Sequence, residues 1–85
     1  MRPAPDTPNR MGRGWQPMLN ARGQPCYQTT DGRFTVTWAK RRQEYRVETP
    51  GRTAEYVGTL RQARGLVDEW RRMDAIQQNP QEQRT

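Results

Sequence analysis

The sequence predicts an α+β domain in which a three-stranded antiparallel sheet packs against one C-terminal amphipathic helix, preceded by a disordered N-terminal arm. Two runs that alternate apolar and polar residues flank a polar break at residues 40–43, which is the pattern of a β-hairpin. A segment with apolar residues at helical spacing follows from residue 60. The first 25 residues hold five of the seven prolines, a density that disfavours regular elements.

The Pro-rich and Gly-rich segment 1–25 is therefore expected to be a flexible arm. Within it Trp15, Met18 and Leu19 lie close together and are candidates for docking on the domain or on a partner protein. Residues 76–85 are almost wholly polar and are expected to form a tail. The domain then spans residues 26–75.

The strands are predicted from alternation with period two. We expect strands at 33–39, 44–48 and roughly 54–57, with turns at Asp31-Gly32, at residues 40–43 and at 49–52. Residues 26–30 are a further candidate for an edge strand. The side chains expected on the buried face are Phe34, Val36, Trp38, Tyr45, Val47 and Tyr56.

The helix has the clearest start signal in the chain. Thr59 and Gln62 stand at the spacing of a capping box, in which each side chain binds the backbone N–H of the other residue. Gly65 costs about 1 kcal/mol against Ala within a helix, so it suggests close approach of the helix to a strand. The apolar stripe consists of Leu60, Ala63, Val67, Trp70 and Met73.

Composition points to a polyanionic partner. The 85-residue chain carries a net charge of +6, with four Arg and one Asp in residues 1–25 and ten cations against seven anions in residues 26–75. Nucleic acid, an anionic membrane surface and an acidic protein all suit such a charge. The mixed polar face of the helix disfavours the membrane, and the lack of a long apolar run or a secretory leader predicts a cytoplasmic protein.

Catalysis is not expected. The chain has no His and a single Cys26, and it has no phosphate-binding glycine loop. We therefore expect no enzyme, no cofactor, no structural zinc and no small-molecule substrate.

The candidate site is basic. The outer side of the predicted sheet would carry Arg33, Thr35, Thr37 and Arg46, and the hairpin tip would carry Lys40, Arg41 and Arg42. Such a surface suits phosphates and base edges in a groove of double-stranded DNA. The alternative is that these residues only solvate an open sheet face and protect its edges from aggregation.

The order of elements also carries a resemblance. A hairpin containing Asp31-Gly-Arg-Phe34 and Glu44-Tyr-Arg-Val47, a third strand, and a helix opened by Gly58-Thr-Leu-Arg-Gln-Ala63 resemble small DNA-binding domains with a three-stranded sheet and one helix. These include the arm-binding domains of tyrosine recombinases and the plant ethylene-response-factor type. The resemblance covers residues 26–75. It implies that Arg33, Thr35, Thr37 and Arg46 enter the major groove, with residues 40–42 near phosphates.

In size and Arg content the chain is also similar to short accessory proteins of actinobacteria and their phages, many of which bind and inhibit a host protein. The sequence thus leaves two functions open. One is non-catalytic binding of double-stranded DNA, and the other is modulation of a host protein through Trp15, Met18 and Leu19.

Overall fold

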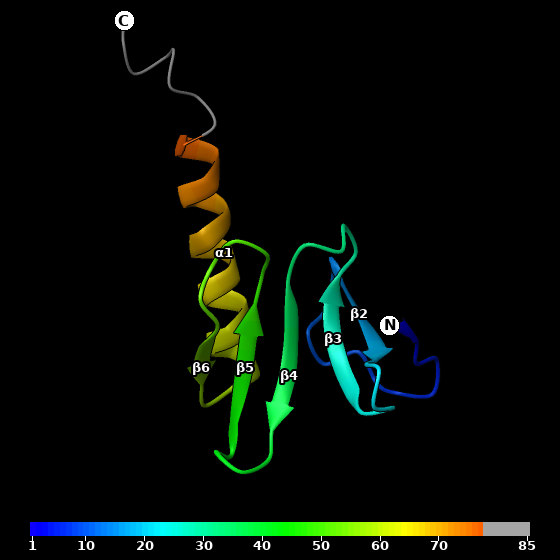
Figure 1. The fold of residues 1–85 in the computed structure, drawn as a ribbon. Coiled ribbons are helices and arrows are strands. Elements are labelled where there is room, and N and C mark those ends of the chain that lie inside the picture. The colour runs from blue at the N-terminus through cyan, green and yellow to red at the C-terminus, as the bar shows by residue number, and fades with distance from the viewer. Residues whose placement is uncertain (78–85) are drawn as a thin grey trace, which may run out of the picture.

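The computed structural model describes residues 1–77, which form one antiparallel sheet and one helix (Figure 1). The strands lie in the sheet in the order of the sequence, so that each pairs with the next. The elements are β1 (Arg2–Pro3), β2 (Trp15–Leu19), β3 (Pro25–Thr29), β4 (Thr35–Ala39), β5 (Glu44–Glu48), β6 (Glu55–Val57) and α1 (Leu60–Gln77).

The α+β layout is as predicted, but the predicted three-stranded sheet is wrong: the sheet has six strands. The hairpin of β4 and β5 and the strand β6 lie where the sequence predicts them. Residues 25–29 are not an edge strand, because β3 pairs with β2 on one side and with β4 on the other. The three-stranded layout behind the resemblance to recombinase domains is thus only part of this sheet.

The N-terminal segment is not disordered. β2 pairs with β3 from Trp15 opposite Thr29 to Leu19 opposite Pro25, and β1 pairs with β2. Prolines deprive a strand of N–H donors but not of acceptors, and the carbonyl of Pro17 accepts from the Ala4 N–H at 3.2 Å. The prolines therefore do not prevent these two strands from pairing.

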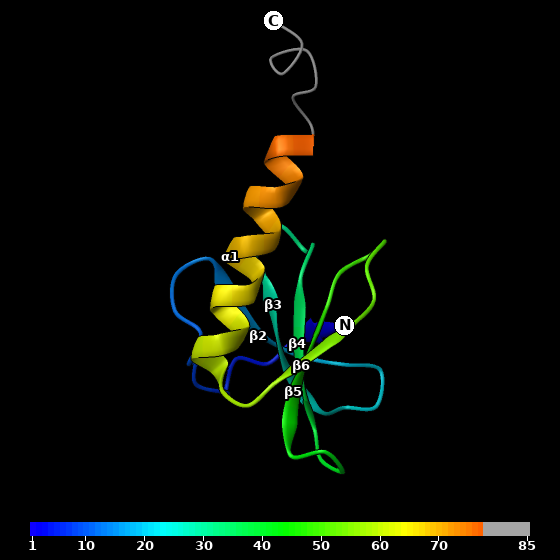
Figure 2. The same ribbon diagram turned by 90° about the vertical axis from the view of Figure 1, so that its left-hand side faces the viewer.

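The core lies between α1 and one face of the sheet (Figure 2). Val36 and Val47 face each other across β4 and β5, and both are almost fully buried. Phe34 lies with its ring centroid 6.3 Å from that of Trp70. The buried cluster consists of Met11, Trp15, Phe34, Val36, Val47, Ala63, Val67 and Trp70.

The capping box predicted at the start of α1 is confirmed. The Gln62 N–H donates to Thr59 Oγ1 at 3.1 Å, and Gln62 Oε1 accepts from the Thr59 N–H at 3.2 Å. The close approach suggested for Gly65 is wrong, because a Cβ at this position would meet nothing within 4 Å.

Ion pairs fasten the second half of α1 to the turns of the sheet. Asp74 accepts from Arg33 Nη2 and Arg52 Nη2, both at 3.0 Å, and Arg71 Nη1 lies 3.0 Å from Asp31 Oδ2. Hydrogen bonds from Thr29 and Arg71 lower the pKa of Asp31 to about 2. These residues hold the helix in place, and each of the three arginines has a carboxylate partner.

Two aromatic residues depart from the predicted core. Trp38 is 45% exposed, although it lies on the same side of the sheet as Val36. Tyr56 faces away from the helix, because it pairs with Arg46 while Val57 pairs with the core residue Tyr45. In a three-residue strand the choice of inward side chain depends on the neighbouring strand, and β6 directs Val57 inward.

The predicted polar tail at 76–85 lies, from residue 78 onward, outside the described residues. Among residues 1–77, no helix combines the length and the apolar character needed to cross a membrane.

Candidate nucleic-acid interface

The outer face of the sheet is the face that α1 does not cover. Residues directly opposite each other in an antiparallel sheet share a face. The pairing places Met18, Cys26, Thr37, Arg46 and Tyr56 in one row across β2 to β6 on the outer face. The predicted positions of Thr37 and Arg46 on a common face are thus observed.

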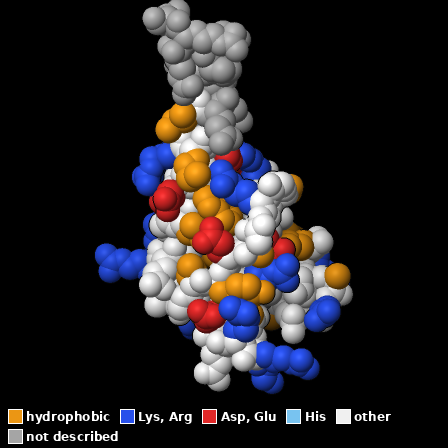
Figure 3. Space-filling model, turned by 60° about the vertical axis from the view of Figure 1, so that its left-hand side comes forward, with side chains coloured by type: hydrophobic (Ala, Val, Ile, Leu, Met, Phe, Trp, Pro, Cys, Tyr) orange, Lys and Arg blue, Asp and Glu red, His pale blue; other side chains and the backbone are white. Residues whose placement is uncertain are grey.

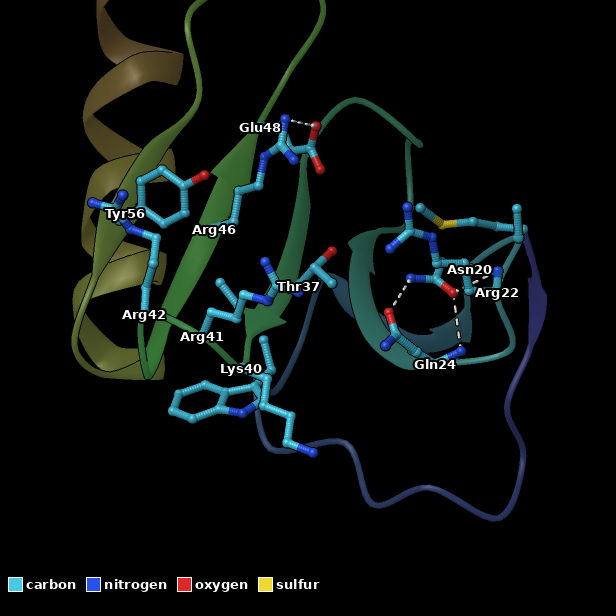
Figure 4. A pocket seen from close by; sticks show the side chains of 14 residues that line it. Asn20, Arg22, Gln24, Thr37, Lys40, Arg41, Arg42, Arg46, Glu48 and Tyr56 are labelled. Atoms are coloured by element: carbon cyan, nitrogen blue, oxygen red, sulfur yellow. Dashed lines mark hydrogen bonds and ion pairs between the residues drawn. The ribbon is translucent and has the colours of Figure 1, made fainter.

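A basic hollow of about 700 Å³ lies beside this row, between the β2–β3 turn (residues 20–24) and the β4–β5 turn (residues 40–43) (Figure 4). Side chains of β4, β5 and their turn form one wall, and Asn20, Arg22 and Gln24 form the opposite wall. The lining includes five cationic side chains, Arg22, Lys40, Arg41, Arg42 and Arg46, and one carboxylate, Glu48.

The β4–β5 turn projects two of these cations into solvent. It closes with hydrogen bonds from the Arg42 N–H to the Ala39 carbonyl at 3.1 Å and from the Gln43 N–H to the Lys40 carbonyl at 3.3 Å. Lys40 and Arg41 are exposed, and no carboxylate of residues 1–77 lies within 4.0 Å of either. In the space-filling view, basic side chains project from the same end of the molecule (Figure 3).

Arg42 and Arg46 are held over the sheet. The Arg42 guanidinium carbon lies 3.8 Å from the ring centroid of Tyr56, and its Nε lies 3.4 Å from Glu44. Arg46 Nη2 lies 3.5 Å from Glu48 Oε2. A cation stacked on a ring is oriented without losing its charge, whereas a neighbouring carboxylate offsets part of it. These two arginines are therefore positioned but partly neutralised.

The β2–β3 turn brings Arg22 to the site. Asn20 Oδ1 accepts from the N–H groups of Arg22 and Gln24, both at 2.9 Å, and Gly23 has a φ of 77°. An Asn that accepts from the backbone two residues later forms an Asx turn, which fixes the loop. Sequence reasoning missed Arg22 because it treated this segment as flexible. The Asn20-Ala-Arg-Gly23 turn between two short apolar runs was the available signal.

The structure thus gathers most of the predicted contact residues. Those around the basic hollow are Thr37, Lys40, Arg41, Arg42 and Arg46. Thr35 lies on the same face but lines a smaller, adjoining hollow. Arg33 lines that smaller hollow too, but β4 begins only at Thr35 and the Arg33 guanidinium pairs with Asp74 of the helix. Tyr56 is an outer-face aromatic that the sequence did not predict.

The three residues predicted to bind a partner protein are used mostly within the fold. Trp15 is 9% exposed in the core and Met18 is 8% exposed beside Cys26 of β3, while Leu19 is half-buried. A buried side chain offers little area to another protein. The apolar cluster that suggested a host-protein partner is therefore explained by packing.

No family model, curated protein or solved structure matches this chain. Within residues 1–77 there is also no cluster of three His, Cys, Asp or Glu side chains able to hold a metal ion.

Proposed function

We propose that this protein binds double-stranded DNA without catalysis, through the outer face of its sheet and the two turns beside it. The basic hollow supports the proposal, since cations from two separate turns converge there with a single carboxylate. Cations that only protect an open sheet from aggregation need not converge. The proposal includes the cytoplasmic location that the sequence predicts.

The arrangement suits a duplex in shape as well as in charge. The major groove is about 12 Å wide and admits a two-stranded β-ribbon. β4 and β5 are flanked by β3 and β6, so only the end of their hairpin is two-stranded, from Ala39 and Glu44 outward. This end carries Lys40 and Arg41, while Thr37 and Arg46 lie on the outer face of the same hairpin. The tip cations would contact phosphates, while Thr37 and Arg46 would face base edges. Arg22, across the hollow, would contact a second stretch of backbone.

The test compares two double variants that lose the same charge. Lys40→Gln with Arg41→Gln removes the exposed tip cations, and Arg61→Gln with Arg64→Gln removes two exposed cations of α1. Affinity for a fluorescent blunt duplex is measured by anisotropy at low salt. We expect the tip variant to lose about tenfold or more, because each phosphate contact adds to the counterion release that drives binding. The helix variant should stay within about twofold, allowing for its lower net charge.

Equal losses in the two variants would show that only net charge matters and would contradict the assigned interface. A circular dichroism spectrum of each variant establishes that it is folded. Because all four positions are exposed, neither variant should disturb the core.

A further inference from the structure

Trp38 is an exposed aromatic residue beside the basic hollow. It is 45% exposed, whereas Trp15 and Trp70 are 9% and 3% exposed. Leaving a large indole half in water forgoes burial that would stabilise the fold. Trp38 lies on the face of the sheet opposite Thr37 and Arg46, and it borders the hollow at the end of β4 together with Lys40 and Arg41, the exposed cations of the β4–β5 turn.

One ring face of Trp38 is left uncovered by its aromatic neighbour. Tyr45 packs against it with a centroid separation of 4.9 Å and an interplanar angle of 62°. A single edge-on neighbour covers at most one of the two faces of the indole. Trp38 therefore combines an indole that is 45% exposed with cations two and three residues further along the chain.

We propose that Trp38 stacks on an unpaired nucleobase, while Lys40 and Arg41 bind the phosphates that flank that base. The proposal rests on the DNA-binding function above and adds a preference to it. Bases inside a duplex stack on each other and present only their edges, so a ring face requires a base outside the stack. The preferred ligand is thus a duplex that adjoins a single-stranded segment. The two exposed cations complement phosphate charge, which favours this ligand over an apolar peptide.

The experiment uses three fluorescent probes with the full-length protein. They are a blunt duplex, the same duplex with a single-stranded overhang, and the same duplex with an overhang of equal length built from abasic sites. The two overhangs carry the same phosphates, so they differ only in the bases that Trp38 would contact. We expect the base-bearing overhang to bind about tenfold more tightly than the abasic one, the usual effect of one stacked base.

Two variants assign that difference to the indole. Trp38→Ala should abolish the preference for the base-bearing overhang over the abasic one, whereas Trp38→Phe should keep most of that preference. Collisional quenching by acrylamide gives a second readout, because Trp15 and Trp70 are buried and quenching reports mainly on Trp38. The base-bearing overhang should protect the fluorescence and the abasic overhang should not.

Equal affinity for the two overhangs, with Trp38 still accessible to acrylamide, would overturn the stacking proposal. If the blunt duplex is still bound in that case, the DNA-binding function stands. Failure to bind any of the three probes at low salt would overturn both.

Discussion

The replacement of Trp15 by Ala tests whether the N-terminal segment belongs to the folded domain. Trp15 lies in β2, is 9% exposed and contributes to the same buried cluster as Phe34 and Trp70. A disordered arm would tolerate the change, whereas a sheet strand would not. The two possibilities therefore differ in the free energy of unfolding by several kcal/mol.

The expected loss follows from buried area. A buried aromatic covers about 150–250 Å², which at about 25 cal/mol per Å² corresponds to about 4–6 kcal/mol. Ala retains part of this burial and the denatured chain already buries some, so we expect a net loss of about 3 kcal/mol. A domain of 85 residues has a total stability of about 4–13 kcal/mol, so this loss is a large part of it.

Urea unfolding followed by far-UV circular dichroism measures this loss without depending on tryptophan fluorescence. In a thermal melt followed by the same signal, the melting temperature of Trp15→Ala should be about 10–20 °C below that of the parent. Trp38→Ala is the matched control. Because Trp38 is 45% exposed, its replacement should lower the free energy of unfolding by well under half as much as Trp15→Ala does. A Trp15→Ala variant within about 0.5 kcal/mol of the parent would show that β2 does not pack on the core.

Three further substitutions test other parts of the account. Gly65→Ala should raise stability by about 0.5–1 kcal/mol in thermal melts, because residue 65 is exposed in α1 and an added Cβ meets nothing within 4 Å; a loss would mean that the position is crowded. Thr59→Ala should cost about 1 kcal/mol by removing the helix cap, with exposed Thr53→Ala as a neutral control. The difference in the free energy of unfolding between the parent and Asp31→Asn should be largest above pH 4 and should shrink as the pH falls toward 2. This is expected because the folded pKa of Asp31, about 2, lies below its ordinary value of 3.8. That difference should be under about 1 kcal/mol, since the Asp31 side chain is 41% exposed. A difference independent of pH would contradict the hydrogen bonds that Asp31 accepts from Thr29 and Arg71.

The parts of the fold that the sequence predicted are those set by neighbours in the chain. Alternation of apolar residues placed β4 and β5, and the spacing of Thr59 and Gln62 placed the start of α1. The strands β1 and β2 were missed because their prolines are a local signal against structure. Pairing with β3 and packing of Trp15 on the core outweigh that signal, and neither is visible in a short window of sequence.

The same distinction applies to the site. Thr37 and Arg46 were predicted on one face because a short hairpin fixes their register. The ion pair of Arg33 was not predicted, because its partner Asp74 lies 41 residues away in the chain. Arg22 joins the hollow only through the pairing of β2 with β3, so its role depends on strands that were not predicted.

The salt dependence of binding to a blunt DNA duplex tests directly whether the outer face of the sheet binds DNA. Three of the five cations at the basic hollow, Arg22, Lys40 and Arg41, have no carboxylate of residues 1–77 within 4.0 Å, and the other two are partly neutralised. Between three and five phosphate contacts predict that the logarithm of the affinity falls with the logarithm of salt concentration with a slope of about −3 to −4.5. Absence of binding at low salt, or a slope near zero, would contradict DNA binding by this face.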